Sequence, residues 1–293
     1  MLVDYSDSNS ETDEPSPGES PGQRKRKASD HEPKNKVDSR RPPPLPTSFH
    51  TLYATNVRTA ASDDPTLHAG RTRQVPHVVG NWPTHVYLEW HPPKQELAML
   101  DDVIEHARPS NDIGRSMHSF LRSELGALQP LHISLSAPLV LKTDQKGPFQ
   151  KSVCSEVHKR RVSVFTVRVT GLAWVANHDG SRYFLVLRLG RPRNDELNKL
   201  LSACNAVARR LGLAELYANK GTCVDKVDLS EQLERSDMTD AFHISIAWAL
   251  QEPDKQAKEQ LGKLNDLKPI DIGFSELKLK LGNVVVDIPF EGP

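Results

Sequence analysis

Two short motifs in this sequence carry the side chains that acid–base chemistry on a phosphate group requires. They are His132-Ile133-Ser134 and His243-Ile244-Ser245. An imidazole changes its charge near neutral pH, so it can accept or donate a proton there. A serine hydroxyl can donate a hydrogen bond to a charged oxygen. The chain has 12 histidines, and chance places a hydroxyl residue two positions after about one or two of them, so the motifs need a structural context.

The context comes from the alternation of side chains around both motifs. Residues 131–136 and 242–247 alternate between apolar positions and polar or small ones, which is the pattern of half-buried strands. One face of the first strand then carries His132, Ser134 and Ser136, and one face of the second carries His243, Ser245 and Ala247. If the strands are neighbours across a pseudo-two-fold axis, two imidazoles and two hydroxyls converge in one cleft. A single strand histidine beside a serine is usually structural, so the duplication is what favours a site.

The residues around the motifs do not favour a metal site. Neither motif has carboxylate or cysteine ligands at useful spacing, and two neutral imidazoles alone form an incomplete coordination sphere. The cysteines, Cys154, Cys204 and Cys223, form no Cys-x-x-Cys pair and are odd in number, which argues against a disulfide framework or a zinc site. We therefore expect reduced thiols, no metal and no cofactor.

The charges of the chain balance, with 38 basic and 38 acidic side chains. Attraction to a polyanion must therefore come from local patches, which excludes a histone-like wrapper. A locally basic region, formed by Lys142, Lys146, Lys151, Arg160 and Arg161, is a candidate track for an RNA backbone and equally a solvated surface. No run approaches the about 20 apolar residues of a membrane span, and the N-terminus is acidic where a signal peptide is basic and then apolar. We expect the protein in the nucleus or cytosol.

The first 46 residues have a composition of their own. They hold 8 of the 22 prolines and few large apolar side chains to offset the entropy of folding. Residues 1–20 contain six acids and no base, whereas residues 21–41 contain eight bases and three acids. QRKRK at 23–27 is a candidate nuclear localisation patch, and PPPLP at 42–46 is a candidate polyproline spacer. We predict a disordered acidic-then-basic tail over 1–46 and a folded domain over 47–293.

Hydrophobic periodicity predicts an α+β fold for that domain. Strands are expected at 84–90, 131–141, 162–176, 182–190 and 241–250, with a hairpin turn at 177–181 and a C-terminal hairpin that turns at Gly282-Asn283. Helices are expected at 94–106, at 112–128 and after Asn194 as a capping residue, and a polar stretch rich in lysine and glutamate follows at 253–266. Strand, helices, motif strand and hairpin are followed by helix, motif strand and hairpin. This order predicts two lobes, with antiparallel sheets lining a central cleft and helices outside.

The motifs HISL at 132–135 and HISI at 243–246 resemble the two His-x-Ser/Thr-x motifs that give the 2H phosphoesterase superfamily its name. Further stretches resemble the Usb-type phosphodiesterases that trim the 3′ end of U6 small nuclear RNA. They are PLPTSFHTLY at 44–53, GRTRQVPHVVGNWPTHVYLEW at 70–90, LVLKTDQKGPF at 139–149 and FHISIAW at 242–248. The family often has a proline-tyrosine element before the second motif, with the tyrosine stacked on the terminal base. The corresponding LERSDMTDAF at 233–242 has no tyrosine.

The resemblance implies a two-lobed, pseudo-symmetric α+β fold with the active site between the lobes. It implies a metal-independent 3′-to-5′ exoribonuclease that trims the oligouridine end of U6 small nuclear RNA, in the nucleus and as part of mRNA splicing. Carried over by position, His132 and His243 are the catalytic residues, and Ser134 and Ser245 bind the substrate phosphate. Attack by a 2′-hydroxyl leaves a 2′,3′-cyclic phosphate, which some members open to a terminal 3′ phosphate. We expect RNA as the partner, no membrane, and a monomer.

Two other functions fit the same motifs. One is a 2′,3′-cyclic nucleotide phosphodiesterase or a ligase-like 2H enzyme. The other is a catalytically inactive RNA-binding adaptor, against which the presence of both histidines and both serines argues. A first guess takes His243 as the base and His132 as the acid, although the motifs are too alike to support either assignment. The sequence also does not determine whether the cyclic product is opened, which 3′ nucleotide is preferred, or which proteins bind.

Overall fold

A computed structural model describes residues 78–108, 117–123, 125–177, 180–217, 237–263 and 269–292. The expected tail at 1–46, the stretch 44–53 and residues 70–77 lie outside these ranges. No helix within them is both long enough and apolar enough to cross a membrane.

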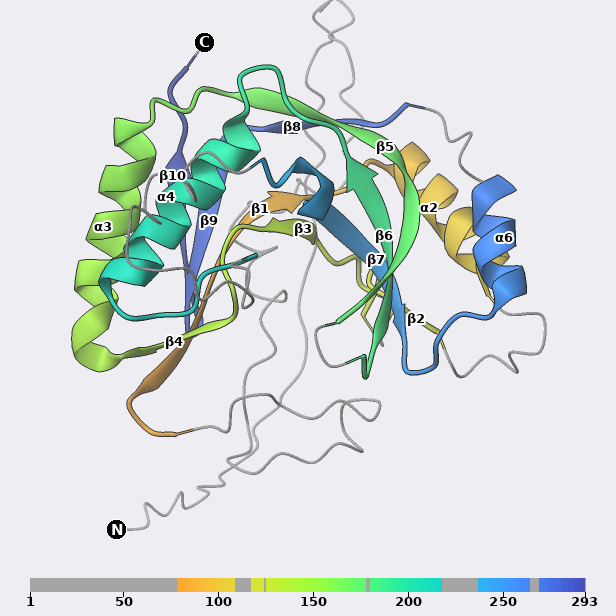
Figure 1. The fold of residues 1–293 in the computed structure, drawn as a ribbon, viewed down its shortest axis with the longest axis horizontal. Helices are drawn as coiled ribbons and strands as arrows, with labels where there is room; N and C mark the ends of the chain where they lie inside the picture. The colour runs from red at the N-terminus through yellow and green to blue at the C-terminus, as the bar shows by residue number, and fades with distance from the viewer. Residues whose placement is uncertain are drawn as a thin grey trace, which may run out of the picture. The chain divides into compact units, whose positions relative to one another are not determined.

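The described residues form a sheet of ten strands (Figure 1). In order across the sheet, the main strands are β10 (Val284–Pro289), β9 (Glu276–Leu281), β1 (Asn81–Trp90), β3 (Leu131–Ser134), β7 (His243–Ala249), β6 (Tyr183–Leu189), β5 (Phe165–Ala176) and β8 (Asp271–Phe274). Two short strands join it, β2 (Met117–Ser119) beside β7 and β4 (Leu139–Lys142) beside β1. These strands pair antiparallel throughout. The predicted α+β class with an antiparallel sheet is confirmed.

The two motif strands, β3 and β7, lie next to each other in the middle of the sheet. They join one half, made of β10, β9, β1 and β3, to the other, made of β7, β6, β5 and β8. The C-terminal hairpin β9–β10 pairs with β1 in the half of the first motif. The earlier hairpin β5–β6 pairs with β7 in the half of the second motif. Each half therefore combines segments that are far apart in the chain, and the two halves do not correspond to two consecutive stretches of sequence.

Four helices of the described residues pack against the sheet. They are α2 (Lys94–His106), α3 (Lys146–Lys159), α4 (Glu196–Arg210) and α6 (Lys255–Lys263), with short 3₁₀ helices at Thr143–Gln145 and Thr239–Ala241. Helices α3 and α4 lie side by side, and α2 and α6 lie toward the other end of the sheet (Figure 1). Helix α4 buries the apolar stripe expected from its sequence, Leu197, Leu200, Leu201, Cys204, Val207 and Ala208.

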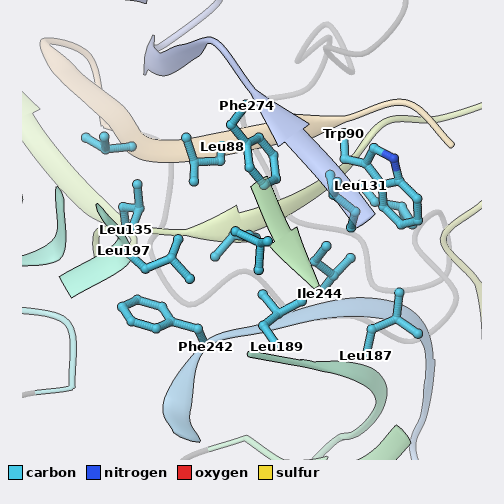
Figure 2. Packing of buried hydrophobic residues seen from close by; sticks show 14 of the residues in the cluster. Leu88, Trp90, Leu131, Leu135, Leu187, Leu189, Leu197, Phe242, Ile244 and Phe274 are labelled. Carbon is cyan, nitrogen blue, oxygen red and sulfur yellow. The ribbon is translucent and has the colours of Figure 1, made fainter. Parts of the chain in front are cut away.

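The apolar face of the sheet forms the core. Ile133 and Ile244, the central residues of the two motifs, are both 0% exposed. Figure 2 shows Ile244 among Leu187, Leu189 and Leu131 in this cluster. Because side chains alternate along a strand, burial of both isoleucines directs the flanking histidines and serines to the opposite, polar face.

The helix predicted at 112–128 is wrong over the part that the structure describes. Met117 to Ser119 form strand β2 beside β7 instead. The N–H of Phe120 also donates to the carbonyl of Ile246 at 2.8 Å. Met117 and Leu121 are buried four residues apart, as in a helix, but Leu125 is 96% exposed. Pairing with β7 therefore determines the structure of this segment, although its apolar spacing is that of a helix. Ile113, the first residue of the predicted stripe, lies outside the described residues.

Two further predictions need correction. The single strand expected at 131–141 is divided into β3 and β4, because the Ser136 hydroxyl replaces a main-chain acceptor for the N–H of Val86 and Pro138 has no N–H to donate. The residue before α4 is Asp195, not the expected cap Asn194, which donates instead to the Glu196 carboxylate.

Helix α3 has no counterpart among the predicted elements. Gly147 and Pro148 in its first turn concealed it, although proline is tolerated there because the first N–H groups of a helix have no intrahelical partner. The buried residues Phe149, Val153 and Val157 recur every four positions, which is the signal that would have predicted it.

The turn of the C-terminal hairpin provides a test of the fold. Gly282 has φ +63°, and a Cβ there would lie 2.7 Å from Cε3 of Trp82. Gly282→Ala therefore combines backbone strain with a clash, and we expect it to lower the free energy of unfolding by about 2–3 kcal/mol in urea denaturation. Gly126, with φ +76° and nothing within 4 Å, is the matched control, for which Ala costs about 1 kcal/mol. Equal losses would contradict this account of the turn.

Candidate active site

The pairing of β3 with β7 determines the geometry of the site. Ile133 lies opposite Ile244 in an antiparallel pair. One step along this register in each direction places His132 opposite Ser245 and Ser134 opposite His243. A local two-fold axis between the isoleucines thus relates one His-Ser unit to the other. Diagonal neighbours in such a pair are about 7–8 Å apart, close enough for both imidazoles to reach one phosphate group.

His132 is solvent-exposed on the polar face, yet protein atoms replace much of the water around it. This loss of hydration is the main cause that lowers the pKa of His132 from 6.5 to about 4, and electrostatic repulsion from the nearby His243 is the second. Glu89, its direct partner on β1, acts in the opposite direction and raises the pKa, while Lys280 lowers it. His132 is therefore unprotonated at neutral pH and able to accept a proton.

His243 is held by a backbone carbonyl. Its Nδ1 lies 2.8 Å from the oxygen of Ala241, and since a carbonyl only accepts, Nδ1 carries the proton. Nε2 is left as the atom that exchanges a proton with a substrate. The same carbonyl accepts a hydrogen bond from the Tyr217 hydroxyl at 3.0 Å, and burial raises the pKa of Tyr217 to about 12, which keeps that hydroxyl protonated.

Strand β1 adds an aromatic wall that the sequence motifs did not assign. The His85 ring lies 5.4 Å from the ring of His132, and the Tyr87 ring lies 5.6 Å from it, both edge-on. His85 and Tyr87 stack at 5.2 Å. Burial, then the His132 and Lys280 charges, lower the pKa of His85 to about 3. Alternation along 84–90 was the available signal, because it places His85, Tyr87 and Glu89 on the face opposite Val86 and Leu88.

Cations from the neighbouring strands also reach the polar face. Lys280 lies opposite His85, and Arg188 lies opposite His243. Arg188 is exposed, and its guanidinium lies 3.5 Å from the carbonyl oxygen of Asp240. Lys278 is instead neutralised, because it binds Glu276 at 2.6 Å and Asp287 at 2.8 Å. Lys280 and Arg188 therefore flank the histidine pair on opposite sides.

The predicted serines do not all share the polar face. Ser134 and Ser245 are both partly exposed, and neither hydroxyl has a hydrogen-bond partner among the described residues. Ser136, expected on the same face, is buried; it accepts from the N–H of Val86 and donates to the carbonyl of Ala137. Ser136 is a structural residue, whereas Ser134 and Ser245 can donate to a bound anion.

The described residues contain no group of three histidine, cysteine or carboxylate side chains placed to hold a metal ion. Cys204 is buried in the core, where its thiol has a pKa raised to about 12 by burial, and Cys154 lies on α3. Neither cysteine belongs to the polar face of the central strands. The arrangement of two imidazoles, two hydroxyls and two flanking cations fits acid–base chemistry on a phosphodiester.

Comparison with known proteins agrees with this class of site. Residues 43–289 match the HVSL family, described as an uncharacterised conserved protein. The chain belongs to the HVSL family.

Its relatives include proteins named U6 snRNA phosphodiesterase 1. The protein from Neurospora crassa is 35% identical over 246 residues, which cover 76% of this chain and 63% of that protein. The human protein is 25% identical over 238 residues, covering 81% of this chain and 76% of the human one. The chain thus spans less than two thirds of the Neurospora protein. The resemblance to the phosphodiesterases of U6 small nuclear RNA is confirmed by these named relatives.

Solved structures similar to this chain include Kluyveromyces marxianus Usb1 with uridine monophosphate. It is 19% identical, with a TM-score of 0.48, over 71% of this chain and 98% of that one. Escherichia coli LigT is 13% identical, with a TM-score of 0.39, over 72% of this chain and 95% of that one.

The charges around His132 predict the sign of two mutational effects. His243→Gln removes a neighbouring positive charge and should raise the pKa of His132, whereas Glu89→Gln removes a negative charge and should lower it further. Imidazole NMR titration of the two variants and the parent protein measures both shifts. Shifts of the same sign in both variants would contradict the arrangement.

Proposed function

We propose that this protein is a metal-independent RNA phosphodiesterase that trims the oligouridine 3′ end of U6 small nuclear RNA as a 3′-to-5′ exoribonuclease. The observation that carries the proposal is the register of β3 and β7, which gathers both His-x-Ser units on one polar face. The named relatives support the substrate, because they are phosphodiesterases of U6 small nuclear RNA.

The reaction is a transesterification within the RNA. The 2′-oxygen of the penultimate ribose forms a bond to phosphorus, and the bond from phosphorus to the 5′-oxygen of the last nucleoside breaks. One imidazole accepts the proton of the 2′-hydroxyl, and the other donates a proton to the departing 5′-oxygen. Each transfer contributes about 10²–10⁴-fold to the rate. The products are a 2′,3′-cyclic phosphate on the shortened RNA and a free nucleoside.

The environments of the two histidines support a proposal for which is the base and which is the acid. His132 is unprotonated at neutral pH because of its lowered pKa, so it is the base. His243 donates from Nδ1 to Ala241, and an imidazolium there can donate from Nε2 to the leaving oxygen while it keeps that bond. His243 is therefore the acid. This proposal differs from the first guess from the sequence, which took His243 as the base and His132 as the acid.

The two hydroxyls and the flanking cations stabilise the phosphate. Ser134 and Ser245 donate to its non-bridging oxygens, where negative charge grows in the transition state. Arg188 and Lys280 add positive charge on the two sides of the histidine pair. No metal or cofactor is required for these steps.

The protein acts in the nucleus as a monomer, and its contribution to splicing is the processed RNA. Its basic cluster at 23–27 serves as the nuclear address. Residues 1–46 form an acidic-then-basic tail, and residues 47–293 form the catalytic 2H phosphoesterase domain.

Removal of either histidine should abolish cleavage. His132→Ala and His243→Ala each eliminate a proton transfer, so we expect kcat/KM on a uridine-tailed oligonucleotide to fall by at least about 10²-fold, with RNA binding largely retained. The matched control is His106→Ala, which removes an exposed imidazole from α2. Full activity in either site variant would exclude a catalytic role for that histidine. An inactive parent protein that still binds RNA would indicate an adaptor.

The attacking group is tested with a modified substrate. An oligonucleotide with a 2′-deoxyribose only at the penultimate position has no nucleophile for the last phosphodiester, so release of the last nucleoside should stop. Gel electrophoresis and mass spectrometry of the 3′ end distinguish a cyclic phosphate from an opened one in the unmodified RNA. Release of nucleotides from an all-deoxy strand, or a rate that excess chelator abolishes and zinc restores, would instead indicate attack by water at a metal.

A further inference from the structure

A pocket lies beside the histidine pair, and no step described above uses it. Its volume is about 560 Å³, within the roughly 300–1,000 Å³ of small-ligand sites. The walls come from the beginning of β1, the segment that leads into β4, and the end of β9 with its turn. The residues that matter for its chemistry are Asn81, Pro83, His85, Pro138, Lys280 and Asn283.

The pocket is continuous with the site through His85. This residue lines the pocket, and its ring contacts that of His132 at 5.4 Å. Alternation along β1 places Pro83 on the same polar face as His85, and the β1–β9 register places Lys280 opposite His85. A ligand in the pocket therefore lies next to His132 and on the side away from His243, because β1 and β7 flank β3 on opposite sides.

The lining has the chemistry of a nucleoside site. Proline rings and the His85 imidazole offer flat apolar surface for stacking of a base, which contributes in a sequence-tolerant way. The amides of Asn81 and Asn283 supply donors and acceptors for a base edge or a ribose. Lys280 provides the positive charge for an adjoining phosphate.

Basic side chains continue beyond the pocket. Lys142 lies opposite Asn81 in the β1–β4 pair, on the same polar face as Pro83 and His85. An exonuclease that removes the last nucleotide needs such a track on one side of the scissile phosphate only, because the 3′ side ends there. The pocket, with Lys280 at one end and Lys142 beyond the other, therefore defines the upstream side.

We propose that this pocket binds the base and ribose of the nucleoside immediately upstream of the scissile phosphate, the one whose 2′-hydroxyl attacks. The proposal rests on the proposed RNA cleavage and adds a second subsite to it. It also agrees with the position of His132, which receives the proton from that same ribose.

The test compares two variants of one turn. Asn283→Trp fills the pocket from the β9–β10 turn, whereas Val284→Trp adds the same side chain at the next residue, which is 56% exposed and does not line the pocket. Binding is measured by fluorescence anisotropy with a uridine-tailed RNA made uncleavable by a 2′-deoxyribose at the penultimate position. Two companion RNAs lack the base at the penultimate or at the terminal position.

We expect Asn283→Trp to weaken binding of the complete RNA at least about fivefold and Val284→Trp to leave it unchanged. The loss should disappear on the RNA without the penultimate base and persist on the RNA without the terminal base. Pro138→Trp, which fills the pocket from the opposite wall, should give the same pattern, and thermal melting verifies that each variant is folded.

A loss that is equal on all three RNAs, a loss that depends on the terminal base instead, or equal binding by both pocket variants and the parent would overturn the subsite. Since the RNA is uncleavable, this outcome is independent of catalysis. A parent protein that passes the binding test but leaves normal RNA intact would disprove the proposed reaction and retain the subsite. A parent protein that cleaves RNA while the pocket variants bind it normally would retain the proposed reaction and disprove the subsite.

Discussion

The rest of the site depends on a single antiparallel contact, the pairing of Ile133 with Ile244. Burial of both isoleucines fixes this register, because a slip by one residue would turn an entire strand over and expose its apolar side chains. The same contact that closes the core thus brings His132 and Ser134 together with His243 and Ser245. The core and the proposed site are coupled here through the two-residue period of a strand, with the apolar side chains on one face and the histidines and serines on the other.

His132 and His243 hold equivalent positions in the two motifs, but their electrostatic environments differ. His132 lies between β1 and β7, where lost hydration and the charges of His243 and Lys280 outweigh the opposing effect of Glu89 and lower its pKa to about 4. His243 has a carbonyl acceptor for one ring nitrogen. The local two-fold symmetry of the motif strands is therefore broken by their neighbours, and this asymmetry supports the proposed difference in role between the two imidazoles.

The sequence predicted those strands and turns whose formation is determined by a local pattern of residues. Alternation located β1, β5, β6 and β7, and the glycine-asparagine pair located the C-terminal turn between β9 and β10. The sequence-based prediction failed where the pairing partner determines the structure. The spacing of Met117 and Leu121 fits a helix, but the segment pairs with β7 and is therefore a strand. The His-x-Ser motifs identified four polar side chains. Alternation along 84–90 places His85 on the polar face, but only strand order brings it beside His132. Arg188 and Tyr217 approach His243 through strand order and a carbonyl contact, which no spacing encodes.

The segment before the second motif contains no tyrosine, and the contacts of Tyr217 show that this residue does not take the place of one. This residue has φ +59°, a strained backbone conformation for a bulky side chain. The strain is offset by edge-on packing of its ring against the buried Phe242 at 5.9 Å and by its hydrogen bond to Ala241. Tyr217 thus supports the carbonyl that orients His243 from within the fold, and its buried ring is not a stacking surface for RNA. The flat surfaces that remain on the polar face include those of the β1 pocket, which adjoins His132 through His85.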